Sequence, residues 1–391
     1  MADRFTLAAS IDYPIIDADA HVYEPPEVWQ SRVPRGMQPR APRVERTADG
    51  DVWLFDGGAR TRPIGLMAAA GTSYLGFRPN GLTYETIRPG HYEACARLAD
   101  MNADGIHAQL LYPSVCEEGA RMFGDDRALQ RACVRAYNEW HVEFCASGKG
   151  RLFGHAVMPA TGVADAVAEL DWALERGYRG VLVSTFPSGR VEPSRDDDPF
   201  WARAEEARVP VALHIGSFHA DGPAAARRFE PEIVLPRASI SKSGANTVPL
   251  VARMLFSGLF ERFPRLRVLL VEANIGWIPA MLEQTDDMFL RYRWFTQTAG
   301  ALPTMPSRAF HRNVWATFMI DTVGMELRHR LNLEHLMWST DYPHTGTDWP
   351  NSRVTIERVF AGVPVDEVRA MLHGNCKRLY ALDEIPERCS A

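Results

Sequence analysis

The stretch Asp-Ala-Asp-Ala-His-Val-Tyr-Glu at residues 17–24 follows two isoleucines and is predicted to form the end of a buried β-strand. Side chains two positions apart lie on the same face of a strand, so Asp17, Asp19 and His21 are expected to share one side. Glu24 comes three residues after His21, where the strand should open into a loop. Carboxylate and imidazole groups side by side at a strand end indicate half of a metal site. A hydrogen-bonded core histidine with turn-capping aspartates would explain the same residues.

The composition indicates a large globular protein. The chain has 391 residues, of which 46% are hydrophobic, enough for one large barrel or two medium domains. Its net charge of -6 comes from 43 basic and 49 acidic residues without a basic run, which argues against nucleic-acid binding. No signal-peptide core and no apolar run of about 18 residues is present. The six cysteines are irregularly spaced and are expected to be reduced. We therefore expect a cytoplasmic protein that binds no membrane.

Short apolar runs alternate with helical patterns along most of the chain. After the opening stretch, strands are expected at residues 107–112, 152–158, 180–185, 210–215, 266–272, 314–320 and 335–339. Such alternation indicates an α/β fold with a parallel sheet, and eight strands fit a closed (β/α)₈ TIM barrel. A doubly wound open sheet is the alternative, disfavoured because no glycine-rich phosphate loop follows any strand. One domain over residues 1–391 is expected, with an irregular insertion at about 30–90, including a strand at 51–55, as lid or interface.

Residue types that bind metals recur at the C-terminal ends of these strands, where barrel enzymes carry their chemistry. Beyond Asp19, His21 and Glu24, the later strand ends supply His214, Glu272, Asp321, Asp341 and His344. Each alone has a structural explanation, because a lone histidine at a strand end is more often a hydrogen-bonded group than a ligand. Their recurrence at separate strand ends nevertheless indicates a metal site. Five other histidines are predicted to be structural, at positions 91, 107, 141, 155 and 373.

At these residues the chain resembles the amidohydrolase superfamily, in the branch around aminocarboxymuconate-semialdehyde decarboxylase. The likeness is carried by Asp19-x-His21, Leu-His214, Ser-Thr-Asp341-Tyr-Pro-His344 and the closing Gly374-Asn375-x-x-Arg378-Leu379-Tyr380. It covers nearly the whole chain. The resemblance implies a (β/α)₈ barrel in which a divalent metal is held by Asp19, His21, His214 and Asp341.

The sixth strand departs from the decarboxylase pattern. Decarboxylases of the branch carry a histidine there that handles the substrate's proton, and aligning on Pro279 places Ala273 at that position. Three further ligand types, Glu24, Glu272 and His344, exceed the roughly four protein ligands that one ion needs. Unpaired buried carboxylates are costly, so either a second cation joins them or Glu24 and Glu272 form salt bridges with arginines. A small group of dinuclear non-haem iron oxygenases in this branch is similar in its opening Asp-x-His-x-x-Glu.

Three enzymatic hypotheses follow, of which a dinuclear non-haem iron monooxygenase is preferred. It would use dioxygen to hydroxylate a small organic substrate such as a carboxylic acid, with Asp341, Glu272 and His344 as catalytic residues. Its two irons, or zinc or manganese in their place, would bind to Asp19, His21, Glu24, His214, Glu272, Asp341 and His344. The second hypothesis is a mononuclear hydrolase of an amide, ester or lactone with Asp341 as general base. The third is a non-oxidative decarboxylase, and an inactive barrel is a fourth possibility. A homo-oligomer such as a dimer is expected by default.

Overall fold

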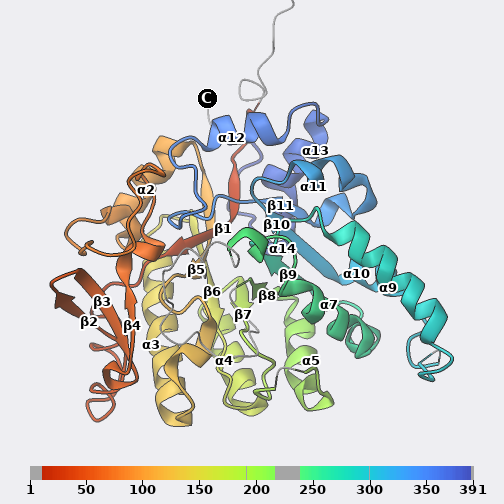
Figure 1. Cartoon of the computed structure of the whole chain (residues 1–391), viewed down its shortest axis with the longest axis horizontal. Coiled ribbons are helices and arrows are strands. Elements are labelled where there is room, and N and C mark those ends of the chain that lie inside the picture. Colours follow the sequence, from red (N-terminus) through yellow and green to blue (C-terminus); the bar gives the residue numbers. More distant parts are fainter. Residues whose placement is uncertain (1–10, 191, 216–237, 299, 389–391) are drawn as a thin grey trace, which may run out of the picture.

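Eight parallel strands form the centre of the molecule, in the order β1-β5-β6-β7-β8-β9-β10-β11 (Figure 1). The strands are β1 Ile16–Val22, β5 Ala108–Pro113, β6 Leu152–Val157, β7 Gly180–Leu182, β8 Val211–His214, β9 Val268–Val271, β10 Val314–Phe318 and β11 Leu336–Trp338. Each overlaps one strand that the sequence predicts. The structure, a computed structural model, describes residues 11–190, 192–215, 238–298 and 300–388.

Backbone hydrogen bonds join the two edges of this sheet. The amide of Asp341, just after β11, donates to the carbonyl of Asp19 in β1 over 2.9 Å, and the amide of His21 donates to the carbonyl of Tyr342 over 2.6 Å. The sheet therefore closes into a (β/α)₈ barrel. This closure confirms the expected fold class and excludes the open doubly wound sheet.

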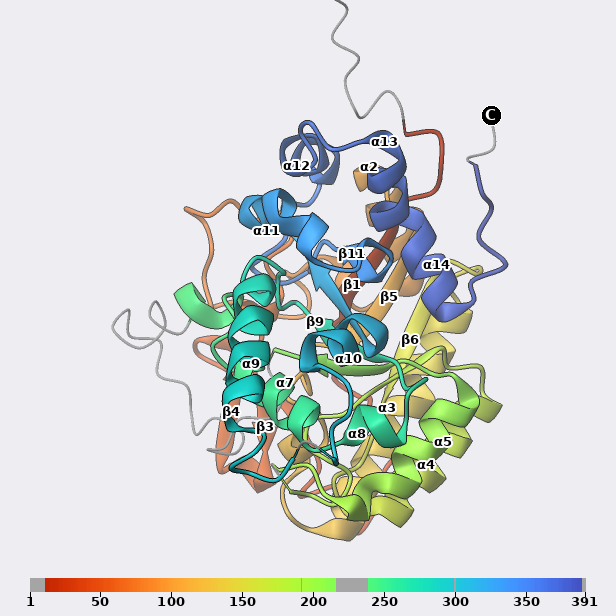
Figure 2. The ribbon, with the colours of Figure 1, turned by 90° about the vertical axis from the view of Figure 1, so that its right-hand side faces the viewer.

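Helices surround the barrel on its outer side (Figures 1 and 2). They are α2 Ala94–Asp104, α3 Arg127–Ala146, α4 Val163–Glu175, α5 Asp198–Ala207, α7 Thr247–Phe256, α8 Leu259–Arg262, α9 Ile278–Tyr292, α10 Pro306–Asn313, α11 Thr322–Leu327, α12 Ser352–Val359, α13 Val365–Arg369 and α14 Asn375–Tyr380. The longest, α3, begins after Asp126, whose side chain accepts hydrogen bonds from the amides of Ala128 and Leu129. Among the described residues, no helix combines the length and apolar character that a bilayer crossing requires.

The insertion after β1 forms a three-stranded antiparallel sheet beside the barrel (Figure 1). Its strands are β2 Arg43–Thr47, β3 Gly50–Phe55 and β4 Arg60–Pro63, of which β3 confirms the predicted strand. The indole of Trp53 in β3 is fully buried and donates a hydrogen bond to the hydroxyl of Tyr84 over 3.0 Å. That hydroxyl in turn donates to the carbonyl of Glu24 over 2.6 Å. The insertion is therefore tied to the end of β1, close to the predicted site.

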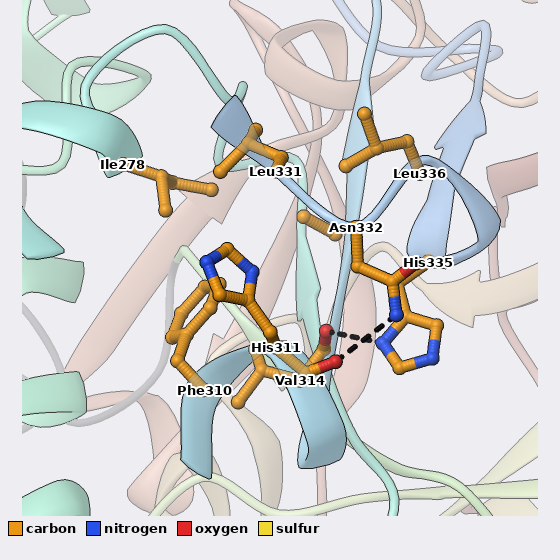
Figure 3. A pocket seen from close by; sticks show the side chains of 9 residues that line it. Ile278, Phe310, His311, Val314, Leu331, Asn332, His335 and Leu336 are labelled. Atoms are coloured by element: carbon orange, nitrogen blue, oxygen red, sulfur yellow. Dashed lines mark hydrogen bonds between the residues drawn. The ribbon is translucent and has the colours of Figure 1, made fainter. Parts of the chain in front are cut away.

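A pocket lies at the opposite end of the barrel, where β10 and β11 begin (Figure 3). Its lining is mainly apolar and contains no carboxylate. Within it, the Nδ1 atom of His335 donates to the carbonyl of Val314 over 3.1 Å, and the imidazole stacks on Trp315 with centroids 3.7 Å apart. These contacts satisfy the histidine, so we interpret this pocket as part of the packing and not as a second catalytic site.

Candidate metal centre

The C-terminal ends of the barrel strands bring together most of the side chains that the sequence predicts as metal ligands. They are Asp19 and His21 of β1, His214 of β8, Glu272 after β9, and Asp341 and His344 after β11. All of them are buried. Parallel strands of one barrel end at the same rim, so residues far apart in the sequence meet there.

His21 lies at the centre of this cluster. Its Nε2 atom is 3.5 Å from Asp19 Oδ1 and 3.5 Å from Asp341 Oδ1. The Nε2 atom of His214 lies 3.3 Å from the same nitrogen. These are the residues that the family resemblance implies as ligands of one divalent ion. Ligand atoms of Asp19, His21 and His214 lie within 4.8 Å of one another, and so do those of His21, Asp341 and His344.

His344 and Glu272 flank this centre. The ring of His344 stacks on that of His21 with centroids 3.7 Å apart, and its Nδ1 atom lies 3.1 Å from Asp341 Oδ1. On the other flank, Glu272 Oε2 lies 3.5 Å from Nε2 of His214. Both residues thus contact the central group, as the sequence predicts.

Several ligand atoms of this group have no hydrogen-bond donor. The Nδ1 atom of His21 donates to the carbonyl of Pro113 over 2.9 Å, which leaves a lone pair on Nε2. Among the described residues, no donor satisfies either carboxylate oxygen of Asp19, and both atoms are buried. Buried polar atoms are normally paired. Converging lone pairs without a donor fit a bound cation.

Electrostatics at the rim favour a cation as well. Burial lowers the pKa of His21 well below its usual value and that of His214 to about 4, so both imidazoles are neutral. Burial, followed by the charges of Glu272 and Asp341, raises the pKa of Asp19. Burial and the charge of Asp341 likewise raise the pKa of Glu272 to about 8. A positive ion would relieve this crowding of carboxylates.

The backbone is strained where two of these residues leave their strands. Glu272 and Asp341 have φ angles of 58° and 55°, in the left-handed region that residues other than glycine seldom adopt. Such a conformation costs on the order of 1–3 kcal/mol and is typical of functional sites. In β1 the pairing with β5 is irregular between Asp17 and Ala20.

Asp17 supports the cluster from behind. Its Oδ1 atom accepts hydrogen bonds from the amides of Thr340 and Asp19 over 2.9 and 3.2 Å. Its Oδ2 atom accepts one from Nε2 of Gln109 over 3.0 Å. The carboxylate therefore links β1 to β5 and to the segment after β11, and it is not part of the ligand group.

The carboxylate of Glu24 is bound by the loop after β5. Its carboxylate accepts hydrogen bonds from the amides of Val115 and Cys116 over 2.8 and 3.2 Å, and from the Cys116 thiol over 3.4 Å. Among the described residues, it belongs to no group of metal-ligand atoms and pairs with no arginine. Of the two roles that the sequence suggests for Glu24, neither is seen in this arrangement; the carboxylate anchors the loop after β5.

We expect Glu24→Gln to leave the metal content of the protein unchanged. The amide nitrogen of glutamine faces backbone donors instead of accepting from them, so about 1–3 kcal/mol of stability is expected to be lost. Metal analysis and urea unfolding of the same preparation measure the two effects. A loss of bound metal in a variant that remains folded would instead assign Glu24 to the metal site.

Two residues at the rim were not predicted from the sequence. The carboxylate of Glu117 lies 3.8 Å from His214 Nδ1 and 3.2 Å from the guanidinium of Arg62, which comes from the insertion. The Nζ atom of Lys242 lies 2.9 Å from Glu272 Oε1. Glu117 closely follows a predicted strand, and Lys242 is one of only three lysines in the chain. The position of Glu117 after a strand and the rarity of lysine are the sequence features from which these two residues could have been predicted.

Two other strand-end residues have structural roles. Asp321 caps α11, since its Oδ1 atom accepts from the amide of Gly324 over 2.7 Å and its Oδ2 atom from the amide of Ile275 over 2.6 Å. Ala273 is buried beside Glu272 and carries no group that could hold a proton.

Comparison with known proteins identifies relatives of this chain. A family model described as amidohydrolase matches residues 16–382. Decarboxylase orsB of Emericella nidulans is 28% identical over 271 residues, which are 65% of this chain and 76% of that protein. Gamma-resorcylate decarboxylase of Rhodococcus jostii is 30% identical over 240 residues, which are 56% of this chain and 68% of that protein.

Solved structures share the fold. An amidohydrolase from Mycobacterium avium subsp. paratuberculosis superposes with a TM-score of 0.70 and 19% identity, covering 95% of this chain and 100% of its own. A 5-carboxyvanillate decarboxylase from Sphingomonas paucimobilis gives 0.63 and 21%, with 96% and 100% covered. A dihydroxybenzoic acid decarboxylase from Polaromonas, solved with manganese and an inhibitor, gives 0.62 and 17%, with 95% and 98% covered.

Proposed function

Because the chain belongs to the amidohydrolase family, whose model spans residues 16–382, we propose that it is a metal-dependent, non-oxidative decarboxylase of an aromatic carboxylic acid. The observation that carries this proposal is the buried group of donor-free carboxylate oxygens and neutral imidazoles at the barrel mouth. The relatives named as decarboxylases support this third hypothesis better than the iron oxygenase that the sequence alone favours.

One divalent ion would be held by Asp19, His21, His214 and Asp341. Mixed carboxylate and imidazole ligands suit manganese, iron or zinc, and a structural relative contains manganese. When bound, the ion would supply positive charge that anchors oxygens of the substrate and stabilises negative charge as it develops. The four side chains are buried, and their burial would keep bulk water away from the ion, which strengthens charge interactions at such a site.

In the proposed reaction, the bond between the ring carbon and the carboxyl carbon breaks. Carbon dioxide leaves, and the electron pair of that bond stays on the ring carbon, which takes up a proton. Ala273 cannot supply this proton. His344 is the imidazole of the cluster outside the set of four ligands, and it lies 3.1 Å from Asp341. We assign the proton transfer to this histidine, held in place by Asp341 and by its stacking on His21.

The proposed function is tested with hydroxybenzoic acids under anaerobic conditions. We expect carbon dioxide release without oxygen, and one deuterium on the product ring when the reaction runs in D₂O. Removal of the metal with a chelator should abolish the release, and manganese should restore it. No carbon dioxide from any acid tested, by a preparation shown to hold metal, would argue against decarboxylation.

A dinuclear oxygenase is a second candidate, because one further group of ligand atoms is present. Glu117, His214 and Glu272 form this group, which shares His214 with the group of Asp19, His21 and His214. Two irons per chain together with substrate-dependent oxygen uptake would support the oxygenase. The hydrolase hypothesis would instead require label from heavy-oxygen water in the product. The number of metal ions per chain, the oxygen consumed and the carbon dioxide released, all measured on one preparation, distinguish the oxygenase from the decarboxylase.

A further inference from the structure

Lys242 reaches into the metal centre from the segment between β8 and α7. Its Nζ atom lies 2.9 Å from Glu272 Oε1, 3.6 Å from Asp341 Oδ2 and 3.0 Å from the sulfur of Met319. A Cβ atom at Gly346 would come within 2.3 Å of Asp341 Oδ2 and 3.1 Å of the Lys242 ammonium. Glycine at that position therefore leaves room for the lysine beside the carboxylate.

Each of the two carboxylates around Lys242 has one oxygen near the lysine ammonium and the other oxygen near a histidine. Glu272 turns Oε1 to the ammonium and Oε2 to His214 Nε2, 3.5 Å away. Asp341 turns Oδ2 to the ammonium and Oδ1 to His21 Nε2, 3.5 Å away. This is how carboxylates that bridge two cations are arranged. One of the two cation positions is filled by a side chain of the protein.

The charges at the rim also favour one metal ion over two. Arg62 pairs with Glu117 over 3.2 Å, and Lys242 pairs with Glu272 over 2.9 Å. Of the other buried carboxylates in the ligand group, Asp19 has no donor on either oxygen among the described residues, and Asp341 Oδ1 has the Nδ1 atom of His344 at 3.1 Å. Unpaired buried charge is costly. A single divalent ion balances two carboxylates, whereas two such ions would leave an excess of positive charge beside Lys242.

We propose that Lys242 is a positioning residue that takes the place of a second metal ion. Its ammonium holds Glu272 and Asp341 from one side, which limits the centre to one divalent ion on the histidine side. The inference rests on the proposed function only in that the centre binds a metal. With Lys242 in this place, a second metal ion has no room, although Lys242 is not part of any of the ligand motifs.

The test counts manganese ions bound to metal-free protein, by titration with free manganese followed by electron paramagnetic resonance. We expect one ion per chain for the wild type and for Lys242→Arg, which keeps the charge. Lys242→Met should bind two ions per chain, and the pair should show the spin coupling of neighbouring ions. Lys149→Met removes a lysine from an exposed position, and this control should still bind one ion.

Two ions in the wild type would overturn the inference, and that measurement requires no variant. One ion in a folded Lys242→Met protein, with Lys242→Gln behaving in the same way, would also overturn it. These outcomes can be distinguished from a failure of the proposed decarboxylase function. A wild type with two ions that still releases carbon dioxide without oxygen refutes only the role of Lys242. One ion without decarboxylation refutes only the reaction.

Discussion

Asp341→Asn is expected to lower kcat/KM for decarboxylation by about 10³-fold, since it removes a predicted ligand and the partner of the proton-donating imidazole. Asp341 Oδ1 lies 3.5 Å from His21 and 3.1 Å from His344, and Oδ2 faces Lys242. Burial alone would raise the pKa of Asp341, but Lys242 and His344 outweigh it and hold the pKa low. The residue is therefore a carboxylate at neutral pH, and the amide of asparagine cannot replace its charge. Steady-state kinetics and metal analysis measure the two losses.

Asp321→Asn is the matched control for this prediction. Asp321 also follows a barrel strand, β10, but its carboxylate caps α11 and lies outside the ligand groups found among the described residues. We expect the control to keep its metal and to lose about 1 kcal/mol of stability from the weakened cap. Full metal content and full activity in Asp341→Asn would show that the reacting group lies elsewhere.

Arg97→Met is expected to lower the free energy of unfolding by about 3 kcal/mol. Arg97 is fully buried in α2 and donates to the carbonyls of Gly90 and His21 over 2.6 and 2.5 Å, and to Oε1 of Gln109 over 3.0 Å. Its guanidinium also lies over the ring of Tyr342, 4.3 Å from the centroid. Methionine has a similar length but no donor, so these buried acceptors would be left unsatisfied.

Thermal unfolding followed by circular dichroism measures this loss, and Arg291→Met is its control. Arg291 pairs with Asp287 one helical turn away at the surface. Exposed pairs contribute about 0–1 kcal/mol, so the control should change little. Because Arg97 holds the carbonyl of His21, we also expect its replacement to weaken manganese binding. Equal stabilities of the two variants would mean that α2 does not brace the end of β1.

Much of the site follows from local sequence pattern. Apolar runs alternating with helical stretches predict the strands, and the strand ends supply Asp19, His21, His214 and Asp341. A parallel barrel brings all its C-terminal strand ends to one rim, whatever the connecting loops do. Their meeting in space therefore requires only the approximate position of each strand. Every observed strand overlaps its predicted range, although several strands are shorter than predicted, as β7 Gly180–Leu182 is against residues 180–185.

Loop residues could not be placed in this way. Glu24 is a predicted ligand in the opening motif, yet its carboxylate accepts hydrogen bonds from the amides of Val115 and Cys116. Lys242 has no motif around it and still reaches Glu272. A loop has no periodicity, and its partners depend on which other segments cover it. Such long-range packing is not visible in a local pattern.

Strand and helix patterns along the chain are thus enough to predict the barrel and the residues at the C-terminal ends of its strands. The pairing of charges at this rim follows only from the folded arrangement. Strand periodicity fixes the direction of a side chain at short range, so it can be read from neighbouring residues. Charge pairing between Lys242 and Glu272, or between Arg62 and Glu117, joins segments far apart in the chain. It therefore depends on closure of the whole barrel and on the docking of its insertion.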